Sequence, residues 1–352
     1  MKCRICGSEN LDLSLSLGEM YVSDFVKDLS ELKKMPMEIF VCDNCGLEQI
    51  GETPELDSMY KKYWYKSGIN ASMINDLREI ATSSCDRLNP RSGDVVCDIG
   101  ANDGTLLDCF PWFMQKVGFD PALSVKEQAG KICDVFVNDY FSADKYPKDF
   151  PKAKIITAIA MFYDLPDPNK FVEDMKEILA DDGIIVLQFT DLLSTIKLND
   201  ISNLCFEHIE VYKLYDIVNL FDKHGMSVFH VEYNLVNGGS LRVYISKGCY
   251  PINPSVPKYL QEEFIYLGEN NLRTMQDQVL RYKDFIREYI SPIKKMGKSI
   301  YALGASTKGS TLLQVLNLGP KEITAIGEIN PDKFGLITVT GIPIISEKEC
   351  FL

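Results

Sequence analysis

Short apolar runs alternate with longer amphipathic segments between residues 93 and 245. The longer segments have apolar residues spaced by three and four, which is typical of helices. This alternation predicts an α/β fold in which helices cover both faces of a mainly parallel sheet. The predicted strands lie in the runs DVVCDIG, KVGFD, DVFVN, KIITAIA, GIIVLQF and SLRVYIS.

The segments on either side of this core have patterns of their own. Before the core, INDLREIATSSCDRL places its apolar residues on one face of a predicted helix. After it, residues 255–296 look helical and polar, and Gly297 opens a second strand–helix–strand pattern in KSIYALGAS, TLLQVLNLG and EITAIGEI. We therefore expect three domains, at residues 1–55, 56–250 and 251–352, because 352 residues exceed one ordinary core.

Two cysteine pairs lie in the turn-rich first 50 residues. The pairs are Cys3 with Cys6 and Cys42 with Cys45. Each Cys-x-x-Cys turn can present two thiolates to a tetrahedral ion, so two such turns complete a shell of four ligands. Four thiolates leave no open position for a reactant. The spacing therefore predicts a structural Zn²⁺ that stabilises a segment with little core of its own.

Composition and charge narrow the function and the compartment. The chain has 50 acidic and 37 basic residues and a net charge of −13, which disfavours general nucleic-acid binding. No run reaches the roughly 18 apolar residues of a membrane span, and MKCRICGSEN lacks the apolar stretch of a signal peptide. We expect a cytoplasmic protein whose eleven cysteines serve as thiols and metal ligands rather than disulfides.

A glycine-rich turn follows the first predicted strand of the core. It contains Asp98, Gly100, Asn102 and Gly104, and a predicted helix follows. Glycines at a strand end let a ligand approach the backbone, and the helix start offers free N–H groups. The G-x-x-x-G spacing differs from the G-x-G-x-x-G of nicotinamide enzymes, which makes an oxidoreductase a weak alternative.

Two further strand ends supply candidate ligands for the same cofactor. Asp120 ends the second strand, at the position where an acid binds ribose hydroxyls in dinucleotide-type folds. Asp139 and Tyr140 follow the third strand, where they could flank an adenine. Together with the glycine turn, these residues predict a site for an adenosyl cofactor.

These motifs carry a family resemblance. Asp-x-Gly-x-x-x-Gly with an acid at the second strand end resembles a class I S-adenosylmethionine methyltransferase. More narrowly, the chain resembles the zinc-containing sugar C-methyltransferases that act on dTDP- or GDP-linked 4-keto deoxysugars. Nearly the whole chain matches in the family's order: the cysteine pairs, YWYKSG, FEHIEVY, NGGSLRVY and GASTKGSTLL. The resemblance implies a zinc-binding N-terminal domain, a class I Rossmann-like core and a Rossmann-like C-terminal domain.

The resemblance also implies catalytic residues. Carbon methylation beside a ketone needs a base for the α-proton and donors for the enolate oxygen. The family's Glu-His pattern maps onto Glu207 and His208, so His208 is the expected base, Glu207 its partner, and Tyr65 a hydroxyl near the reacting carbon. The other two histidines, His224 and His230, are expected to be structural.

The chain departs from the family at one point. Many relatives have Tyr-His-Glu-His, whereas Cys205 and Phe206 occupy the first two places here. The tyrosine role is therefore open to Tyr63, Tyr65 or Tyr212, or the reaction differs. We expect Tyr63 and Tyr212 to contact the substrate.

Substrate contacts are also expected from two later turns. Asn237 begins an Asn-Gly-Gly-Ser turn that is either part of the active-site wall or a hairpin turn. Ser306 and Lys308 lie in GASTKGST between a strand and a helix, where hydroxyls, N–H groups and a lysine could bind a diphosphate. The alternative for this second turn is an ordinary capped helix start.

The expected reaction is C-methylation of a nucleotide-linked keto-deoxysugar by a monomer or homodimer, giving a branched sugar for a surface polysaccharide or natural product. O- or N-methylation of a sugar nucleotide is an alternative. An amide- or hydroxyl-methylating enzyme could use a carboxylate such as Asp164, whereas helix initiation explains Asp167. An inert zinc-bearing binding protein is an alternative of another class.

Overall fold

The structure is a computed structural model that describes the chain except residues 31, 62–63, 249, 270 and 352. Its centre is a seven-stranded sheet in the order β11-β12-β9-β8-β5-β6-β7. Strand β12 runs antiparallel to both of its neighbours, and the pairs from β9 to β7 are parallel. The strands are β5 (Val95–Ile99), β6 (Gln115–Phe119), β7 (Val135–Val137), β8 (Ala153–Ile159), β9 (Leu179–Phe189), β11 (Ser227–Asn234) and β12 (Ser240–Ser246).

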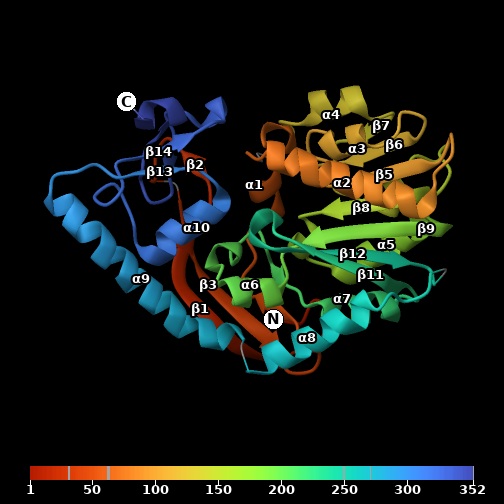
Figure 1. The fold of residues 1–352 in the computed structure, drawn as a ribbon, viewed down its shortest axis with the longest axis horizontal. Helices are drawn as coiled ribbons and strands as arrows, with labels where there is room; N and C mark the ends of the chain where they lie inside the picture. The colour runs from red at the N-terminus through yellow and green to blue at the C-terminus, as the bar shows by residue number, and fades with distance from the viewer. Residues whose placement is uncertain (31, 62–63, 249, 270, 352) are drawn as a thin grey trace.

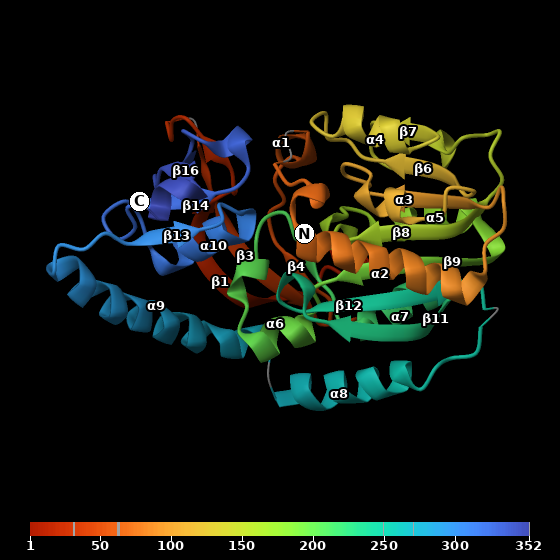
Figure 2. The ribbon, with the colours of Figure 1, turned by 45° about the horizontal axis from the view of Figure 1, so that its top comes forward.

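Helices cover both faces of this sheet (Figures 1 and 2). One buried cluster joins the sheet to α2 (Ala71–Leu88), α3 (Thr105–Cys109) and α4 (Lys126–Ile132). A second cluster joins the other face to α5 (Pro168–Ile178), α7 (Leu214–Lys223) and α8 (Ser255–Glu269). The predicted α/β core with its two helical layers is therefore confirmed.

Local sequence signals set where the helices of this core begin. The Asn70 side chain accepts a hydrogen bond from the Ser72 backbone N–H at the start of α2. At α5 the Asp167 side chain accepts from the Lys170 N–H, and Pro168 occupies the first turn. Such caps satisfy N–H groups that have no partner within the helix, which explains Asp167 as a helix start.

The N-terminal segment forms a sheet that we did not expect from its turn-rich sequence. Four antiparallel strands pair in the order β1-β3-β4-β10, where β10 comes from the loop after the core's fifth parallel strand. In β3 the alternate residues Met37 and Ile39 are buried, a period of two that suits strands, whereas in β1 the neighbours Ser14 and Leu15 are both buried at a register shift in the pairing with β3. The strands are β1 (Leu11–Tyr21), β3 (Lys34–Cys42), β4 (Glu48–Ile50) and β10 (Glu210–Val211), and helix α1 (Leu56–Tyr60) follows β4.

The C-terminal part is a small parallel sheet, β13-β14-β16, with α10 packed beside it. The long helix α9 connects it to the core (Figure 1). A two-stranded ladder of β2 and β15 joins it to the N-terminal segment. The elements are β2 (Phe25–Val26), α9 (Leu272–Lys295), β13 (Tyr301–Leu303), α10 (Thr307–Leu316), β14 (Ala325–Glu328), β15 (Ile337–Thr338) and β16 (Ile344–Ser346). Helix α6 (Leu192–Leu198) follows β9 of the central sheet.

Among the described residues, no helix combines the length and apolarity needed to cross a bilayer.

Candidate active site and zinc site

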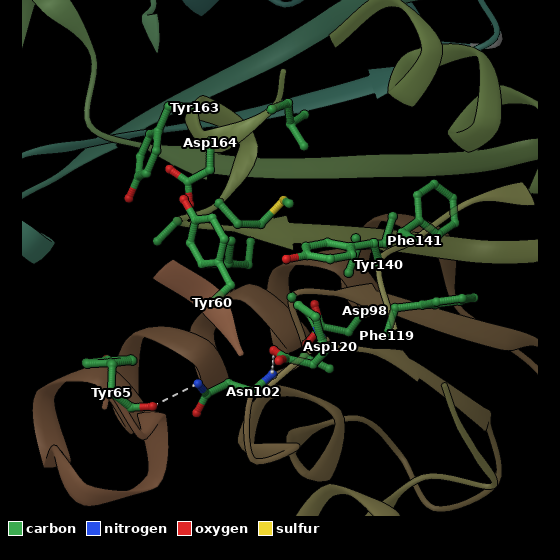
Figure 3. A pocket seen from close by; sticks show the side chains of 18 of the residues that line it. Tyr60, Tyr65, Asp98, Asn102, Phe119, Asp120, Tyr140, Phe141, Tyr163 and Asp164 are labelled. Carbon is green, nitrogen blue, oxygen red and sulfur yellow. Dashed lines mark hydrogen bonds between the residues drawn. The ribbon is translucent and has the colours of Figure 1, made fainter. Parts of the chain in front are cut away.

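A cavity of about 550 Å³ lies at the carboxyl ends of the parallel strands (Figure 3). Its wall includes the residues that end β5, β6 and β8, together with residues from α1, α2 and the start of α10. In open α/β sheets, ligands bind outside the carboxyl ends of the strands. The fold therefore brings the expected cofactor turn and the expected substrate loops to one cavity.

The glycine-rich turn approaches this cavity with its backbone. Gly100 has a φ of +75°, and a Cβ there would lie 3.0 Å from Cγ of Met161. Gly104 has a φ of +84° at the start of α3, and a Cβ there would lie 3.0 Å from Cδ1 of Ile132. Both positions therefore require glycine, and of the two Gly100 lines the cavity.

Asn102 and Asp120 connect the glycine-rich turn to the end of β6 by a hydrogen bond. The Asn102 backbone N–H donates to Oδ2 of Asp120 at 2.9 Å (Figure 3). The Ala122 N–H donates to Oδ1 of the same carboxylate at 2.8 Å. Each carboxylate oxygen has a second lone pair, so Asp120 can still accept from ribose hydroxyls in the cavity. Asn102 also bonds with its side chain to the backbone of Tyr65 and Ser67, which holds that segment across the turn.

The other expected cofactor residues also line the cavity. Asp98 accepts from Oγ1 of Thr157 at 2.6 Å, and burial raises the pKa of its carboxyl to about 7. Tyr140 lies on the wall beside Asp139, and its hydroxyl donates to Asp57 of α1 at 3.1 Å. Aromatic and apolar side chains here, with Asp120 opposite, fit an adenosyl group: a flat base and a ribose whose hydroxyls need an acceptor.

His208 lines the same cavity, whereas His224 and His230 do not. Its Nδ1 lies 2.8 Å from the backbone carbonyl oxygen of Asn203. Burial and the nearby Lys308 ammonium lower the pKa of His208 to about 3. A carbonyl oxygen can only accept, so the neutral ring carries its hydrogen on Nδ1 and its lone pair on Nε2. The imidazole is therefore neutral, with a lone pair on Nε2 that can accept a hydrogen bond.

Glu207, the expected partner of His208, and the candidate tyrosines do not all reach the cavity. Glu207 is buried, does not line the cavity, and has an Oε2 atom without a hydrogen-bond partner among the described residues. The acceptor at Nδ1 of His208 is accordingly Asn203 rather than Glu207. Tyr65 lines the cavity, and Tyr212 is buried in the core, away from it. Tyr63 lies outside the described residues.

The C-terminal part contributes to the wall of the same cavity. Ser306, Thr307 and Lys308 at the start of α10 line it, as does Asn237. Nζ of Lys308 donates to the Asn237 backbone oxygen at 2.7 Å, and burial lowers the pKa of the ammonium. Oγ of Ser306 caps the helix by accepting from the Gly309 N–H. Three of the five expected substrate residues, Asn237, Ser306 and Lys308, therefore line the cavity together.

The structure adds two cavity tyrosines that the sequence patterns did not single out, and it places Asp164 in the same cavity. Tyr60 comes from α1, and Tyr163 and Asp164 come from a turn after β8 (Figure 3). The Tyr163 ring lies against His208, with 4.0 Å between the ring centroids. Only Asp164 had a signal, as a carboxylate after the fourth predicted strand. The two tyrosines reach the cavity from segments whose sequences do not predict a site.

The four expected zinc ligands form one cluster. Sγ atoms of Cys3, Cys6, Cys42 and Cys45 all lie within 4.8 Å of one another, with 3.5 Å between Cys3 and Cys45 and 3.6 Å between Cys6 and Cys42. Zn–S bonds of about 2.3 Å in a tetrahedron place sulfur atoms about 3.8 Å apart. The thiols therefore fit a Zn²⁺ ion, and the cluster provides the structural zinc site.

Comparisons with known proteins agree with this arrangement. Residues 3–60 match the family model of a zinc binding domain, residues 73–231 that of a methyltransferase domain, and residues 235–351 that of a C-methyltransferase C-terminal domain. The C-methyltransferase NovU of Streptomyces niveus is 26% identical over 361 residues, covering 99% of this chain and 86% of that protein.

Solved structures overlap with about half of the chain. The plantazolicin methyltransferase BpumL in complex with SAH has a TM-score of 0.39 and 11% identity over 48% of this chain and 81% of its own. An S-adenosylmethionine-dependent methyltransferase from Clostridium acetobutylicum has a TM-score of 0.40 and 10% identity over 50% of this chain and 92% of its own.

The three family models follow one another along the chain in the order that its motifs predicted. The chain is therefore a zinc-binding, S-adenosylmethionine-dependent methyltransferase whose C-terminal part matches the model of a C-methyltransferase C-terminal domain.

Proposed function

We propose that the chain methylates a carbon next to the keto group of a dTDP- or GDP-linked keto-deoxysugar. One observation carries this proposal: a single cavity joins the glycine turn, a neutral His208 and the hydroxyls and lysine at the start of α10. A carbon acid needs a base beside it, and a nucleotide diphosphate needs N–H groups, hydroxyls or a cation. The cavity offers both.

One end of the cavity is the proposed binding site of S-adenosylmethionine. Bound S-adenosylmethionine supplies a methyl group made electrophilic by the positive sulfur. The chain contributes Asp120 for the ribose hydroxyls, Tyr140 beside the adenine, and the close backbone at Gly100. These residues align the methyl group for transfer and exclude water from the cavity.

His208 is the proposed base. Its Nε2 atom has the lone pair because Asn203 engages Nδ1. A base whose pKa in the empty protein is about 3 removes a proton only if the imidazolium is stabilised when it forms. The substrate diphosphate can supply part of that stabilisation by pairing with Lys308, whose ammonium is one cause of the low pKa.

The C-terminal end is the proposed site of the nucleotide diphosphate. Ser306 and Thr307 place hydroxyls at the start of α10, where a helix of ten residues also presents free N–H groups. Lys308 adds a positive charge that bonds only to the neutral Asn237 backbone oxygen in the contacts described. We place this reaction in the cytoplasm, with the branched sugar product used for a surface polysaccharide or natural product.

The test is a product assay with a panel of dTDP- and GDP-linked 4-keto sugars. The purified protein and S-adenosylmethionine are incubated with each sugar, and mass spectrometry follows the gain of one methyl group. We expect one or a few keto sugars to be methylated and their reduced hydroxy counterparts to remain unchanged. Methylation of the hydroxy sugars, or of none of the panel, would contradict the proposal.

O-methylation is the second candidate, because the carboxyl of Asp164 lies in the cavity and could take a hydroxyl proton. Deuterium exchange at the sugar carbon separates the two reactions. Carbon methylation requires removal of a C–H proton, so exchange in heavy water should occur without methyl transfer, whereas O-methylation gives none.

A further inference from the structure

Asp164 is a carboxyl on the cavity wall that the reaction above does not use. It ends the turn Phe162–Asp164 after β8, and its Oδ1 atom is buried without a hydrogen-bond partner among the described residues. Its carboxyl contacts the hydroxyl of Tyr60, and Figure 3 shows the two groups facing each other. A buried polar atom without a partner is rare in folded proteins, and a ligand bound in the cavity that Asp164 lines is one way to satisfy the carboxyl.

The contact with Tyr60 does not give an ionised Asp164 a full hydrogen bond. The Tyr60 hydroxyl also lies 3.0 Å from the backbone carbonyl oxygen of Glu207, to which it donates. A phenol has one hydrogen, and a carbonyl oxygen can only accept. Tyr60 therefore serves two acceptors with one hydrogen. Asp164 cannot rely on it for the full hydrogen bond that a buried carboxylate needs.

The charged groups around Asp164 also oppose its ionisation. Glu207 and Glu210 are the carboxyls whose charge acts on it, and Arg4 pairs with Glu210 at 3.5 Å. No ion pair in the described part of the chain includes Asp164. Burial and these like charges raise the pKa of the Asp164 carboxyl well above its usual value.

The cations that line the cavity are engaged elsewhere. Nζ of Lys170 in α5 donates to Asp174 at 2.6 Å, and Nζ of Lys308 donates to the backbone oxygen of Asn237 at 2.7 Å. His208, which lines the same cavity, is neutral. A carboxyl in such surroundings holds its proton to a higher pH than an exposed aspartate does, and the protonated form can act as a hydrogen-bond donor.

Asp164 and His208 are placed so that both could reach the keto group of one substrate and the carbon next to it. Tyr163 precedes Asp164 in the chain, and its ring lies 4.0 Å from the His208 ring between centroids. Both Asp164 and His208 line the cavity. A keto group and the carbon next to it are only one bond apart. A base for the carbon and a donor for the oxygen must therefore lie on neighbouring parts of one wall.

We propose that Asp164 is a catalytic acid that donates a hydrogen bond from its carboxyl to the keto oxygen of the substrate while His208 removes the neighbouring proton. This role rests on the proposed function. The C–H bond breaks, its proton goes to Nε2 of His208, and its electron pair forms the carbon–carbon double bond. The carbonyl π pair moves to the oxygen, where the proton of Asp164 stabilises the negative charge.

Deuterium exchange into the substrate tests this role without methyl transfer. The protein is incubated in heavy water with S-adenosylhomocysteine and the keto sugar that the wild type methylates, and exchange is followed by mass spectrometry. Asp164→Asn keeps an N–H donor at the same place, so exchange should stay within about tenfold of the wild type. Asp164→Ala removes the donor, and exchange should fall by about 100-fold to 1000-fold.

The pH dependence separates an acid from a structural contact. Because the protonated form is active, wild-type exchange should decline as the pH rises through the pKa of Asp164, and Asp164→Asn should lack that decline. Calorimetry with S-adenosylhomocysteine should give the same affinity for all three proteins, which shows that the variants are folded.

Two results would overturn different parts of this account. If the wild type exchanges and Asp164→Asn loses as much activity as Asp164→Ala, the residue acts as a carboxylate and its role as an acid is wrong. If the wild type neither exchanges nor methylates any keto sugar, the proposed function fails, and the role of Asp164 fails with it.

Discussion

Nδ1 of His208 lies 2.8 Å from the backbone carbonyl oxygen of Asn203. This one contact fixes the tautomer of the only histidine that lines the described cavity. A backbone acceptor orients the ring without adding a negative charge, which is consistent with a pKa far below the usual value for histidine. The contact defines the imidazole as a neutral acceptor before any substrate binds.

Lys308 should control affinity for the nucleotide sugar. Lys308→Ala removes the ammonium at the start of α10, and we expect KM for the sugar nucleotide to rise about tenfold, because a charge-assisted hydrogen bond contributes roughly 1.5–3 kcal/mol. Affinity for S-adenosylhomocysteine should not change. Steady-state kinetics and calorimetry measure the two effects. Lys321→Ala, an exposed lysine of the same domain, is the control. An unchanged KM in Lys308→Ala would contradict the diphosphate site.

Asp120 should control affinity for the cofactor. Asp120→Asn replaces one of the oxygens that accept from the Asn102 and Ala122 N–H groups, and it removes the negative charge near the ribose hydroxyls. We expect calorimetry to show at least about tenfold weaker binding of S-adenosylhomocysteine. Asp108→Asn, at an exposed position of α3, should bind as the wild type does. Equal affinity for both variants would place the ribose elsewhere.

Removing zinc should unfold the N-terminal sheet. Cys42 is buried at the end of β3, so Cys42→Ser removes a ligand and weakens the strand pairing around it. Metal analysis should show one zinc per wild-type chain and less than half of that in the variant. The Tm should fall by about 5–10 °C. Cys85→Ser in α2, outside the cluster, should keep both values. Full zinc content in Cys42→Ser would refute a four-thiolate site.

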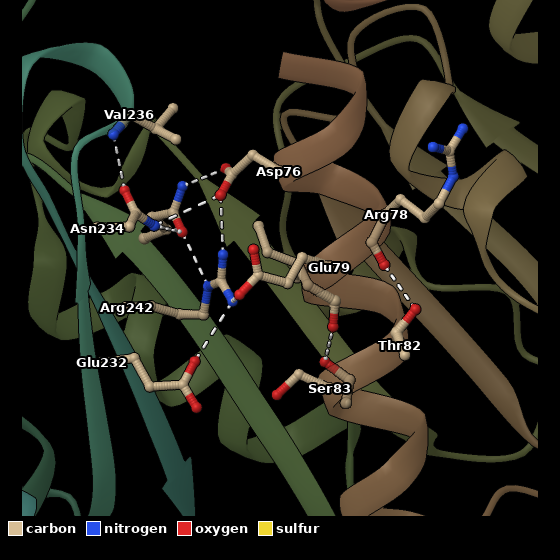
Figure 4. Close-up of polar contacts among 12 residues, drawn as sticks. Asp76, Arg78, Glu79, Thr82, Ser83, Glu232, Asn234, Val236 and Arg242 are labelled. Atoms are coloured by element: carbon tan, nitrogen blue, oxygen red, sulfur yellow. Dashed lines mark hydrogen bonds and ion pairs between the residues drawn. The ribbon is translucent and has the colours of Figure 1, made fainter. Parts of the chain in front are cut away.

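A buried ion pair fixes α2 beside the sheet (Figure 4). Nη2 of Arg242 in β12 donates to Oδ1 of Asp76 at 2.9 Å, and Nε donates to Gln188 at 2.8 Å. Arg242 is only 1% exposed, so Asp76→Ala leaves a buried charge without its nearest partner.

We expect Asp76→Ala to lose about 3–5 kcal/mol of unfolding free energy in a urea titration. Because Met73 and Leu77 of α2 line the cavity, binding of S-adenosylhomocysteine should weaken as well. Arg78→Ala changes an exposed residue of the same helix and should stay within about 0.5 kcal/mol. Equal stability of the two variants would show that the pair contributes little.

The core and the zinc ligands could be predicted because their signals are local. Strand runs, the glycine turn and the Cys-x-x-Cys pairs are each read within a few residues. The prediction for residues 1–50 missed the sheet of β1, β3, β4 and β10, because β10 comes from a distant loop and the two cysteine turns dominated the pattern.

The rest of the cavity depends on contacts between distant segments. Tyr60 meets the Glu207 carbonyl across 147 positions, and Lys308 meets Asn237 across 71. No spacing within either segment predicts such a contact, since the folded sheet brings the segments together. Cys205 occupies the position of the family's tyrosine, and local sequence could not show which other tyrosine lies near His208. Tyr163 lies beside His208 in the fold but 45 positions before it in the sequence.

The central claim is that the methyl group is transferred to carbon. The most direct test uses S-adenosylmethionine with an isotope-labelled methyl carbon and a keto sugar that the protein methylates. NMR of the product should show the label coupled to a ring carbon next to the keto group, and His208→Ala should reduce its formation by about 100-fold or more. A label bonded to oxygen or nitrogen, or near wild-type turnover by His208→Ala, would contradict the account.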